Sequence, residues 1–240
     1  MTRRAALIAT AVAAVVIAAI AAFLLWPRPS GQAPTASATP ASTPTDDADT
    51  SGRPVAVFIG DSYTVGTGTS LDGTGFPGTL GELRGWNAVN LAIPGTGYST
   101  GREDGRCPEA GCTSYIGVLP DAVAFDPDIV VVSGGRNDLG RRHLEPAVTA
   151  FYTELRSQLP DAQLVVTSPL WDDSAAPEAL VTLREQVERE ATRVGAEYLD
   201  LGDLFLDRPD LIAPDDLHPN EEGLALIAQL IDELLPPPAG

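Results

Sequence analysis

The chain has 240 residues and a formal net charge of −18, from 33 acidic and 15 basic side chains. This length supports one domain with an ample core together with additional segments. Nucleic-acid binding needs clustered cations that neutralise phosphates, so the acidic balance argues against a nucleic-acid partner.

The start of the chain predicts a membrane anchor. Two arginines precede residues 5–26, an uncharged and almost entirely apolar run, and about 20 apolar residues suffice for a helix to cross a bilayer. A cleaved signal peptide has a shorter apolar region, roughly 7–15 residues, with a small-residue cleavage site close behind it. We therefore expect an uncleaved anchor with residues 1–4 in the cytoplasm and the domain outside. Secretion after signal cleavage is the alternative.

Residues 27–53 consist mostly of Pro, Ala, Ser, Thr and Asp. Such a composition cannot bury enough apolar area to fold. The segment is interpreted as a disordered, semi-stiff linker that leads to one domain at residues 54–236.

From Pro54 onward, strand patterns alternate with helix patterns. Short apolar runs typical of buried strands lie at Pro54–Gly60, Asn87–Ala92, Asp128–Ser133, Gln163–Thr167 and Glu197–Leu201. Segments with helical periodicity and length lie at His143–Gln158, Pro177–Val194 and about Asn220–Leu235. The alternation predicts an α/β fold, a three-layer α/β/α sandwich with a central parallel sheet.

Four polar or glycine-containing clusters occur beside these elements. They are Gly60-Asp61-Ser62 after the first strand, Gly95 after the second, Gly135-Arg136-Asn137-Asp138 after the third, and Asp215-Asp216-Leu217-His218 before the last helix. In open parallel sheets the functional groups lie beyond the carboxyl ends of the strands. We therefore expect the four clusters to converge on one edge of the sheet.

In order and spacing, these clusters resemble the SGNH (GDSL-type) hydrolase family over about Pro54 to Leu235. The family blocks match at Ser62 in a GDS motif, Gly95, Asn137 in a GxND motif, and His218 in a DxxH motif. The first block reads Gly-Asp-Ser-Tyr rather than Gly-Asp-Ser-Leu, at a position that varies in the family. The resemblance implies an SGNH or flavodoxin-like sandwich and a serine esterase that uses no metal or organic cofactor.

The chemistry of the same residues supports this interpretation. A serine hydroxyl needs a base within hydrogen-bond reach, which His218 can supply for Ser62, and Asp215 can fix the imidazole tautomer. Asp216 competes for that role, but the DxxH spacing favours Asp215. Hydrogen-bond donors would stabilise the tetrahedral oxyanion. The candidates are the backbone N–H groups of Ser62 and Gly95 and the side-chain amide of Asn137.

The remaining candidates are few. His143, the other histidine, follows two arginines and is expected at the surface. Cys107 and Cys112 lie in a polar loop with no histidine nearby, which favours a local disulfide over a metal site or free thiols. Three aromatic side chains would either line the site as apolar walls or be ordinary packing: Tyr63, Tyr98 and Trp171.

The predicted function is hydrolysis of carboxylic esters through an acyl-enzyme. The same triad would serve an O-acyltransferase or deacetylase acting on cell-surface glycans, and a non-catalytic surface binding module is a third possibility. The expected partners are the ester substrate (a small molecule, a lipid or an acylated glycan) and, through the N-terminal helix, the membrane. The chain is expected to be a monomer.

Overall fold

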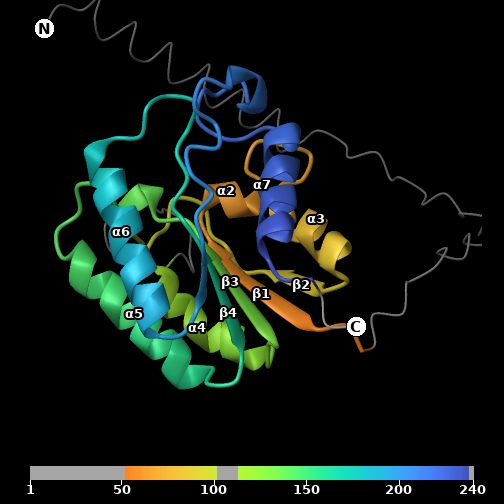
Figure 1. Cartoon of the computed structure of the whole chain (residues 1–240), viewed down its shortest axis with the longest axis vertical. Coiled ribbons are helices and arrows are strands. Elements are labelled where there is room, and N and C mark those ends of the chain that lie inside the picture. The colour runs from red at the N-terminus through yellow and green to blue at the C-terminus, as the bar shows by residue number, and fades with distance from the viewer. Residues whose placement is uncertain (1–51, 102–112, 238–240) are drawn as a thin grey trace, which may run out of the picture. The chain divides into compact units, whose positions relative to one another are not determined.

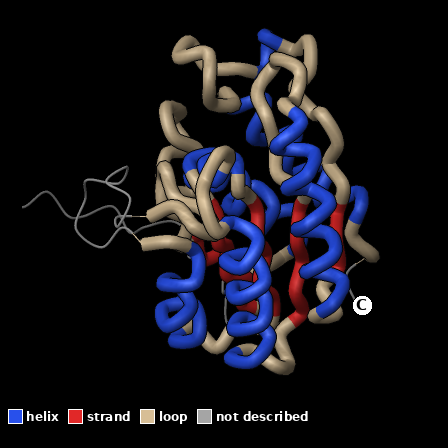
Figure 2. The backbone as a smooth tube through the Cα atoms, turned by 90° about the vertical axis from the view of Figure 1, so that its left-hand side faces the viewer, coloured by secondary structure: helices blue, strands red, loops and turns tan. Residues whose placement is uncertain are grey.

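The computed structural model describes residues 52–101 and 113–237, which contain a parallel five-stranded sheet (Figures 1 and 2). The strands are β1 (Val55–Gly60), β2 (Asn87–Asn90), β3 (Ile129–Ser133), β4 (Gln163–Thr167) and β5 (Glu197–Leu199). Their order is β2-β1-β3-β4-β5, and every neighbouring pair is parallel. β3 lies at the centre and is buried along its whole length, which explains its continuous apolar sequence.

Helices cover both faces of the sheet (Figure 1). One face packs against α4 (Tyr115–Ala124), α5 (Leu144–Gln158) and α6 (Glu178–Arg193), and the other against α3 (Gly75–Arg84) and α7 (Glu221–Leu234). Successive side chains of β3 alternate between the two cores: Val130 and Val132 face α4–α6, while Ile129 and Val131 face α3 and α7. This alternation is the ordinary period of a strand, and it completes three layers.

Three short elements sit at the ends of strands or in loops. They are α2 (Ser62–Val65), which follows β1, and two 3₁₀ turns, η2 (Arg136–Asp138) and η3 (Pro209–Leu211). The predicted three-layer α/β/α architecture with a parallel sheet is confirmed, and the eight predicted elements are found within about two residues of their expected ends.

Two helices were not expected from the sequence. α3 contains three glycines and a proline, and α4 contains Pro120, all of which lower helix propensity. Packing explains α3: a Cβ at Gly81 would lie 2.9 Å from the Cβ of Ala88 in β2, so glycine lets the helix approach the edge of the sheet. Tertiary contact here outweighs local preference.

Other predictions fall outside the described residues. The predicted anchor at 5–26, nearly all of the linker and both cysteines, Cys107 and Cys112, belong to the ranges that are not described. Within 52–101 and 113–237, no helix has the length and apolarity needed to cross a membrane.

Candidate active site

The nucleophile candidate Ser62 is the first residue of α2, directly after β1. Asp61 caps this short helix, because its Oδ1 accepts the backbone N–H of Tyr63 at 3.0 Å. The turn is tight: a Cβ at Gly60 would lie 2.2 Å from Thr64 Oγ1 and 2.3 Å from the carbonyl oxygen of Ser133. The glycine therefore lets β1 bend sharply into α2 against the end of β3. Ser62 is 8% exposed at this bend.

The loop that carries Gly95 lies against the same strand end. The N–H of Ile93 donates to the Gly60 carbonyl at 3.1 Å, and Thr96 Oγ1 contacts the same oxygen at 3.4 Å. Gly95 has φ +77°, a left-handed conformation that glycine adopts without strain. The second predicted block is thus brought beside the first.

Asn137 lies in η2, directly after β3. Its Nδ2 donates to the carbonyl oxygen of Thr96 at 2.9 Å. A side-chain amide has two N–H groups, so this bond orients the amide and leaves the other N–H available for a bound oxyanion. The hydrogen bond also joins the Asn137 turn to the Gly95 loop.

The neighbouring Asp138 is fully buried and has a structural role. Its carboxylate accepts the N–H groups of Tyr98 and Ser99 at 2.8 and 2.9 Å, together with the Ser99 hydroxyl at 2.9 Å. Asp138 therefore holds the loop at Tyr98 and Ser99 against the turn that carries Asn137.

His218 and Asp215 form a close pair on the loop before α7. His218 Nδ1 lies 2.6 Å from Asp215 Oδ2, and the His218 backbone N–H donates to Asp215 Oδ1 at 3.0 Å. The side-chain hydrogen bond from His218 lowers the pKa of Asp215 to about 2. An ionised carboxylate at Nδ1 favours the tautomer with the proton on that nitrogen, which leaves Nε2 as an acceptor.

The loop around this pair is closed by backbone hydrogen bonds. The Ala213 N–H donates to the His218 carbonyl at 2.7 Å, and the Asn220 N–H donates to the Leu211 carbonyl at 2.9 Å. Asn220 then caps α7 by accepting the Gly223 N–H at 2.9 Å. The loop is thereby anchored at the N-terminus of a long helix.

The structure shows which aspartate and which histidine form the pair: Asp215 rather than Asp216, and His218 rather than His143. Asp216 is exposed and has φ +56°, and within the described residues no hydrogen bond joins its carboxylate to His218. His143 is exposed at the start of α5, as expected. Asp215 is therefore the carboxylate paired with His218.

The turn with Ser62 and the loop with His218 are adjacent. The ring of Tyr63 lies edge-on to the ring of His218, with 5.9 Å between centroids, and the Tyr63 hydroxyl donates to the Leu217 carbonyl at 2.5 Å. Within the described part of the chain, no hydrogen bond joins Ser62 Oγ directly to His218. The contacts through Tyr63 are what bring the two predicted residues together.

The three aromatic candidates behave differently. Tyr98 belongs to the core, because it is 2% exposed and its hydroxyl pairs with that of Tyr152 at 2.6 Å. Of the two alternatives for this residue, ordinary packing is therefore correct and a wall of the site is wrong. Tyr63 packs on His218, and Trp171 stacks on Arg136, with the guanidinium carbon 4.4 Å from the ring centroid. Sequence reasoning gave Arg136 no role, although its place beside Asn137 in the GxND motif is a usable signal.

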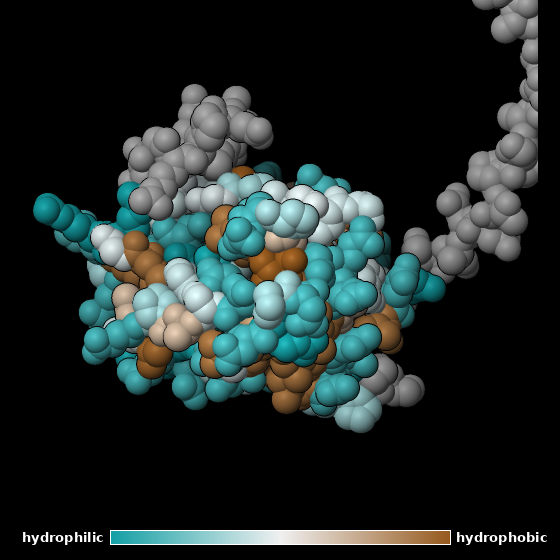
Figure 3. Space-filling model, turned by 90° about the horizontal axis from the view of Figure 1, so that it is seen from above, coloured by the Kyte–Doolittle hydropathy of each residue, from teal (hydrophilic) through white to brown (hydrophobic). Residues whose placement is uncertain are grey.

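The face above the sheet combines polar and apolar surface. Figure 3 views this face from the top of Figure 1, where β1 runs into α2, and shows apolar surface near its centre with polar residues around it. Leu217, beside His218, is one of the exposed large apolar residues, at 39%.

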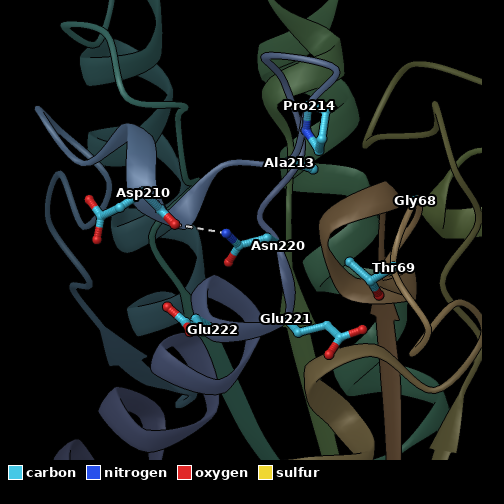
Figure 4. A pocket seen from close by; sticks show the side chains of 8 residues that line it. All are labelled: Gly68, Thr69, Asp210, Ala213, Pro214, Asn220, Glu221 and Glu222. Carbon is cyan, nitrogen blue, oxygen red and sulfur yellow. Dashed lines mark hydrogen bonds between the residues drawn. The ribbon is translucent and has the colours of Figure 1, made fainter.

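A surface pocket of about 390 Å³ lies at the N-terminus of α7 (Figure 4). It is lined by Gly68, Thr69, Asp210, Ala213, Pro214, Asn220, Glu221 and Glu222. Asn220 Nδ2 donates to the Asp210 carbonyl at 2.8 Å. None of the predicted triad or oxyanion residues lines this pocket.

The acidic side chains of the described residues do not gather into a metal site. In the described ranges, no three or more His, Cys, Asp or Glu side chains are grouped so that they could hold a metal ion.

Comparison with known proteins agrees with the fold and with the motifs. The GDSL-like lipase/acylhydrolase family matches residues 58–226. A GDSL lipase of Mycobacterium tuberculosis is 32% identical over 193 residues, which cover 76% of this chain and 81% of that protein.

Solved structures show the same fold. A lipolytic protein of the G-D-S-L family from Desulfitobacterium hafniense has a TM-score of 0.60 at 18% identity, over 76% of this chain and all of that one (100%). A two-domain esterase active on acetylated mannans has a TM-score of 0.59 at 18% identity, over 77% of this chain and 50% of that one.

The fold and the candidate site together define the class of this protein: a three-layer α/β/α sandwich whose parallel sheet carries a serine, an asparagine and a His–Asp pair near its carboxyl edge. More particularly, the chain belongs to the GDSL-like lipase/acylhydrolase family, whose members are hydrolases that act on esters. The predicted family and enzyme class are thus confirmed.

Proposed function

We propose that this protein hydrolyses carboxylic esters through an acyl-enzyme on Ser62. Ser62 Oγ attacks the ester carbonyl while His218 Nε2 takes its proton, and the leaving alkoxide recovers that proton from His218. Water then attacks the acyl-enzyme by the same route and releases the carboxylic acid. The triad is Ser62-His218-Asp215.

The proposed oxyanion hole uses donors from three turns. They are the backbone N–H groups of Ser62 and Gly95 and the free N–H of the Asn137 amide. These donors are fixed before substrate binds, because each turn is hydrogen-bonded to a neighbouring strand end or loop. Preorganised donors of this kind stabilise the developing negative charge without reorganisation.

One observation carries the proposal above the others. His218 Nδ1 lies 2.6 Å from Asp215 Oδ2, on a loop that contacts the residue following Ser62. A surface binding module would need no such hydrogen-bonded histidine–carboxylate pair beside a serine. We therefore favour catalysis over a purely binding role.

Acyl transfer or deacetylation on glycans is the second candidate function. It is supported by the similarity to an esterase active on acetylated mannans and by the polar surroundings of the apolar patch. The acidic chain, with its net charge of −18, disfavours polyanionic substrates. Hydrolysis and transfer would differ only in whether water or a sugar hydroxyl receives the acyl group.

The test is turnover of p-nitrophenyl esters of increasing chain length, run beside acetylated glycans with and without a sugar acceptor. Ser62→Ala should keep the fold and lose ester turnover, by on the order of 10⁴-fold or more, because the nucleophile is missing. A serine-directed phosphonate should label the wild type at Ser62 alone. Full activity in Ser62→Ala, or labelling of a different serine, would refute the proposal.

A further inference from the structure

Arg136 is held on several sides beside the proposed triad. Its guanidinium carbon lies 4.9 Å from the centroid of the Tyr63 ring and 4.4 Å from that of Trp171. One terminal nitrogen lies 3.1 Å from Asp172 Oδ2, and the other donates to the Tyr63 hydroxyl. The Arg136 side chain is 9% exposed. Stacking and charge-assisted hydrogen bonds together fix a guanidinium in one place.

Tyr63 connects Arg136 to the loop that carries His218, the proposed base. Its hydroxyl accepts from Arg136, so its own hydrogen is directed to the Leu217 carbonyl, 2.5 Å away. Burial raises the pKa of Tyr63 above its ordinary value, so the hydroxyl keeps that hydrogen at neutral pH. The ring of the same residue packs edge-on against the His218 imidazole.

The peptide bond that leads into His218 is consequently held at both of its polar groups. The Leu217 carbonyl accepts from Tyr63, and the His218 N–H donates to Asp215 Oδ1 at 3.0 Å. Because a peptide unit is planar, two fixed points define its orientation. That orientation sets the direction in which the imidazole leaves the backbone.

Each member of this chain of contacts is the immediate sequence neighbour of a residue proposed for catalysis: Tyr63 of Ser62, Arg136 of Asn137, and Leu217 of His218. We propose that Arg136 and Tyr63 are positioning residues. They hold three segments in a fixed position relative to one another: the turn of Ser62, the turn of Asn137 and the loop of His218. The roles are defined relative to Ser62 and His218, so this inference rests on the proposed function.

A substrate-binding role for Arg136 is the competing explanation. An arginine that recognises an anionic group of the substrate would present free N–H groups to solvent. Arg136 instead pairs with Asp172 and is covered by two rings. The two explanations differ in kinetics: loss of a positioning residue lowers kcat, whereas loss of a binding residue raises KM.

The test compares Tyr63→Phe and Arg136→Met with the wild type, using the full chain and one p-nitrophenyl ester. Tyr63→Phe keeps the ring and removes only the hydroxyl. We expect its kcat to fall about tenfold, the factor that one hydrogen bond is worth, with KM changed by less than about twofold. Arg136→Met should lower kcat at least as much, because it releases the Tyr63 hydroxyl as well as its own contacts.

Arg84 offers a matched control. Its guanidinium carbon lies 5.5 Å from the Trp86 ring centroid, its Nη1 lies 3.1 Å from Asp232 Oδ1, and its side chain is 7% exposed. It therefore has the same kinds of contact as Arg136, but at the end of α3 away from Ser62. Arg84→Met should lower the thermal midpoint as Arg136→Met does and leave kcat within about twofold of the wild type.

The two histidines supply a readout that does not depend on turnover. In NMR spectra of the full chain, Tyr63→Phe and Arg136→Met should shift or broaden the imidazole signals of His218. The signals of His143 should stay unchanged as the internal reference. A merely stabilising contact would leave both histidines as they are in the folded protein.

The outcomes separate this inference from the proposed function. Unchanged kcat in Tyr63→Phe, a change confined to KM, or an equal loss of kcat in Arg84→Met would overturn the positioning role while Ser62→Ala still tests the triad. If the wild type cleaves no ester, the proposed function fails. The His218 signals then still decide whether Arg136 and Tyr63 fix the loop.

Discussion

The two histidines of the chain lie in contrasting surroundings, and this makes them a paired test of the base. His218 pairs with Asp215, and its side chain is 13% exposed. His143 is exposed at the start of α5, where its side chain forms no capping hydrogen bond. We expect His218→Ala to lower kcat/KM by on the order of 10⁴-fold or more, because no other group can accept the serine proton. His143→Ala should stay within a few-fold of the wild type.

Both variants should be measured at a pH where the wild type is fully active. The thermal midpoint of each serves as the control for folding. Equal losses in the two variants, or a loss only in His143→Ala, would contradict the assignment of His218 as the base.

Asn137 is the side-chain member of the proposed oxyanion hole. Asn137→Ala should lower kcat by on the order of 10²–10³, the usual loss for one such donor. KM should change little, because the contact strengthens only as charge develops. Steady-state kinetics on one ester would show this. A change confined to KM would mean instead that Asn137 binds the substrate.

At the scale of elements, hydrogen bonds join the turns that follow β1, β2 and β3 to one another. Thr64 Oγ1 donates to the Ser133 carbonyl at 3.0 Å, and Asn90 Nδ2 donates to the Thr64 carbonyl at 3.2 Å. Asn137 in turn donates to the Thr96 carbonyl. The geometry of the site therefore depends on three strand ends together, and no single loop determines it.

Asp61 is a further link between these turns, and it predicts a pH effect on stability. Its carboxylate accepts from Tyr63 N–H at 3.0 Å and lies 3.4 Å from Gly135 N. Burial raises the pKa of Asp61 to about 6. The folded protein thus binds this proton more tightly than the unfolded chain, where the pKa is near 3.8. The stability from this group is present below pH 3.8 and is lost as pH rises through 6.

Asp61→Asn removes this titration and keeps a carbonyl that can accept from Tyr63. The free energy of unfolding of Asp61→Asn minus that of the wild type should therefore rise between pH 4 and 7, by up to about 3 kcal/mol. Urea unfolding of both proteins across this range measures the difference. Asp215 titrates near pH 2 and is common to both proteins, so it cancels. A difference that stays constant with pH would count against a raised pKa.

At the scale of the whole molecule, the apolar run near the N-terminus predicts where the domain acts. We propose that residues 5–26 anchor the chain in the membrane and that the domain lies outside the cytoplasm. Protease added to intact cells should then release a soluble fragment with esterase activity, because the Pro- and Ala-rich segment at 27–53 is predicted to be a disordered linker, and such linkers are preferred sites of cleavage.

The fragment's N-terminus, read by mass spectrometry, should fall within the linker. A domain that is cut only after the cells are lysed would contradict this topology. A fragment found already free in the medium without protease would instead support cleavage of a signal peptide. The proposed disulfide between Cys107 and Cys112 would be consistent with either extracytoplasmic location.

The sequence by itself determined the layer architecture and the residues of the candidate site. Buried parallel strands are continuous apolar runs, as in Ile129–Ser133, and these runs are local signals. Ser62 and Asn137 follow two such strands, β1 and β3, so their position at one edge follows from the general rule for parallel sheets. His218 instead lies on the loop before α7, where the motif spacing predicted it.

Only the tertiary structure decided how these residues are held. The hydrogen bond from Tyr63 to Leu217 joins residues 154 positions apart, and that from Arg136 to Tyr63 spans 73. The burial of Tyr98 and the helices α3 and α4 likewise depend on neighbours from distant segments. Periodicity and motif spacing report only what lies within a few residues along the chain. Contacts between distant segments, including the strand order β2-β1-β3-β4-β5, arise when the elements pack against one another.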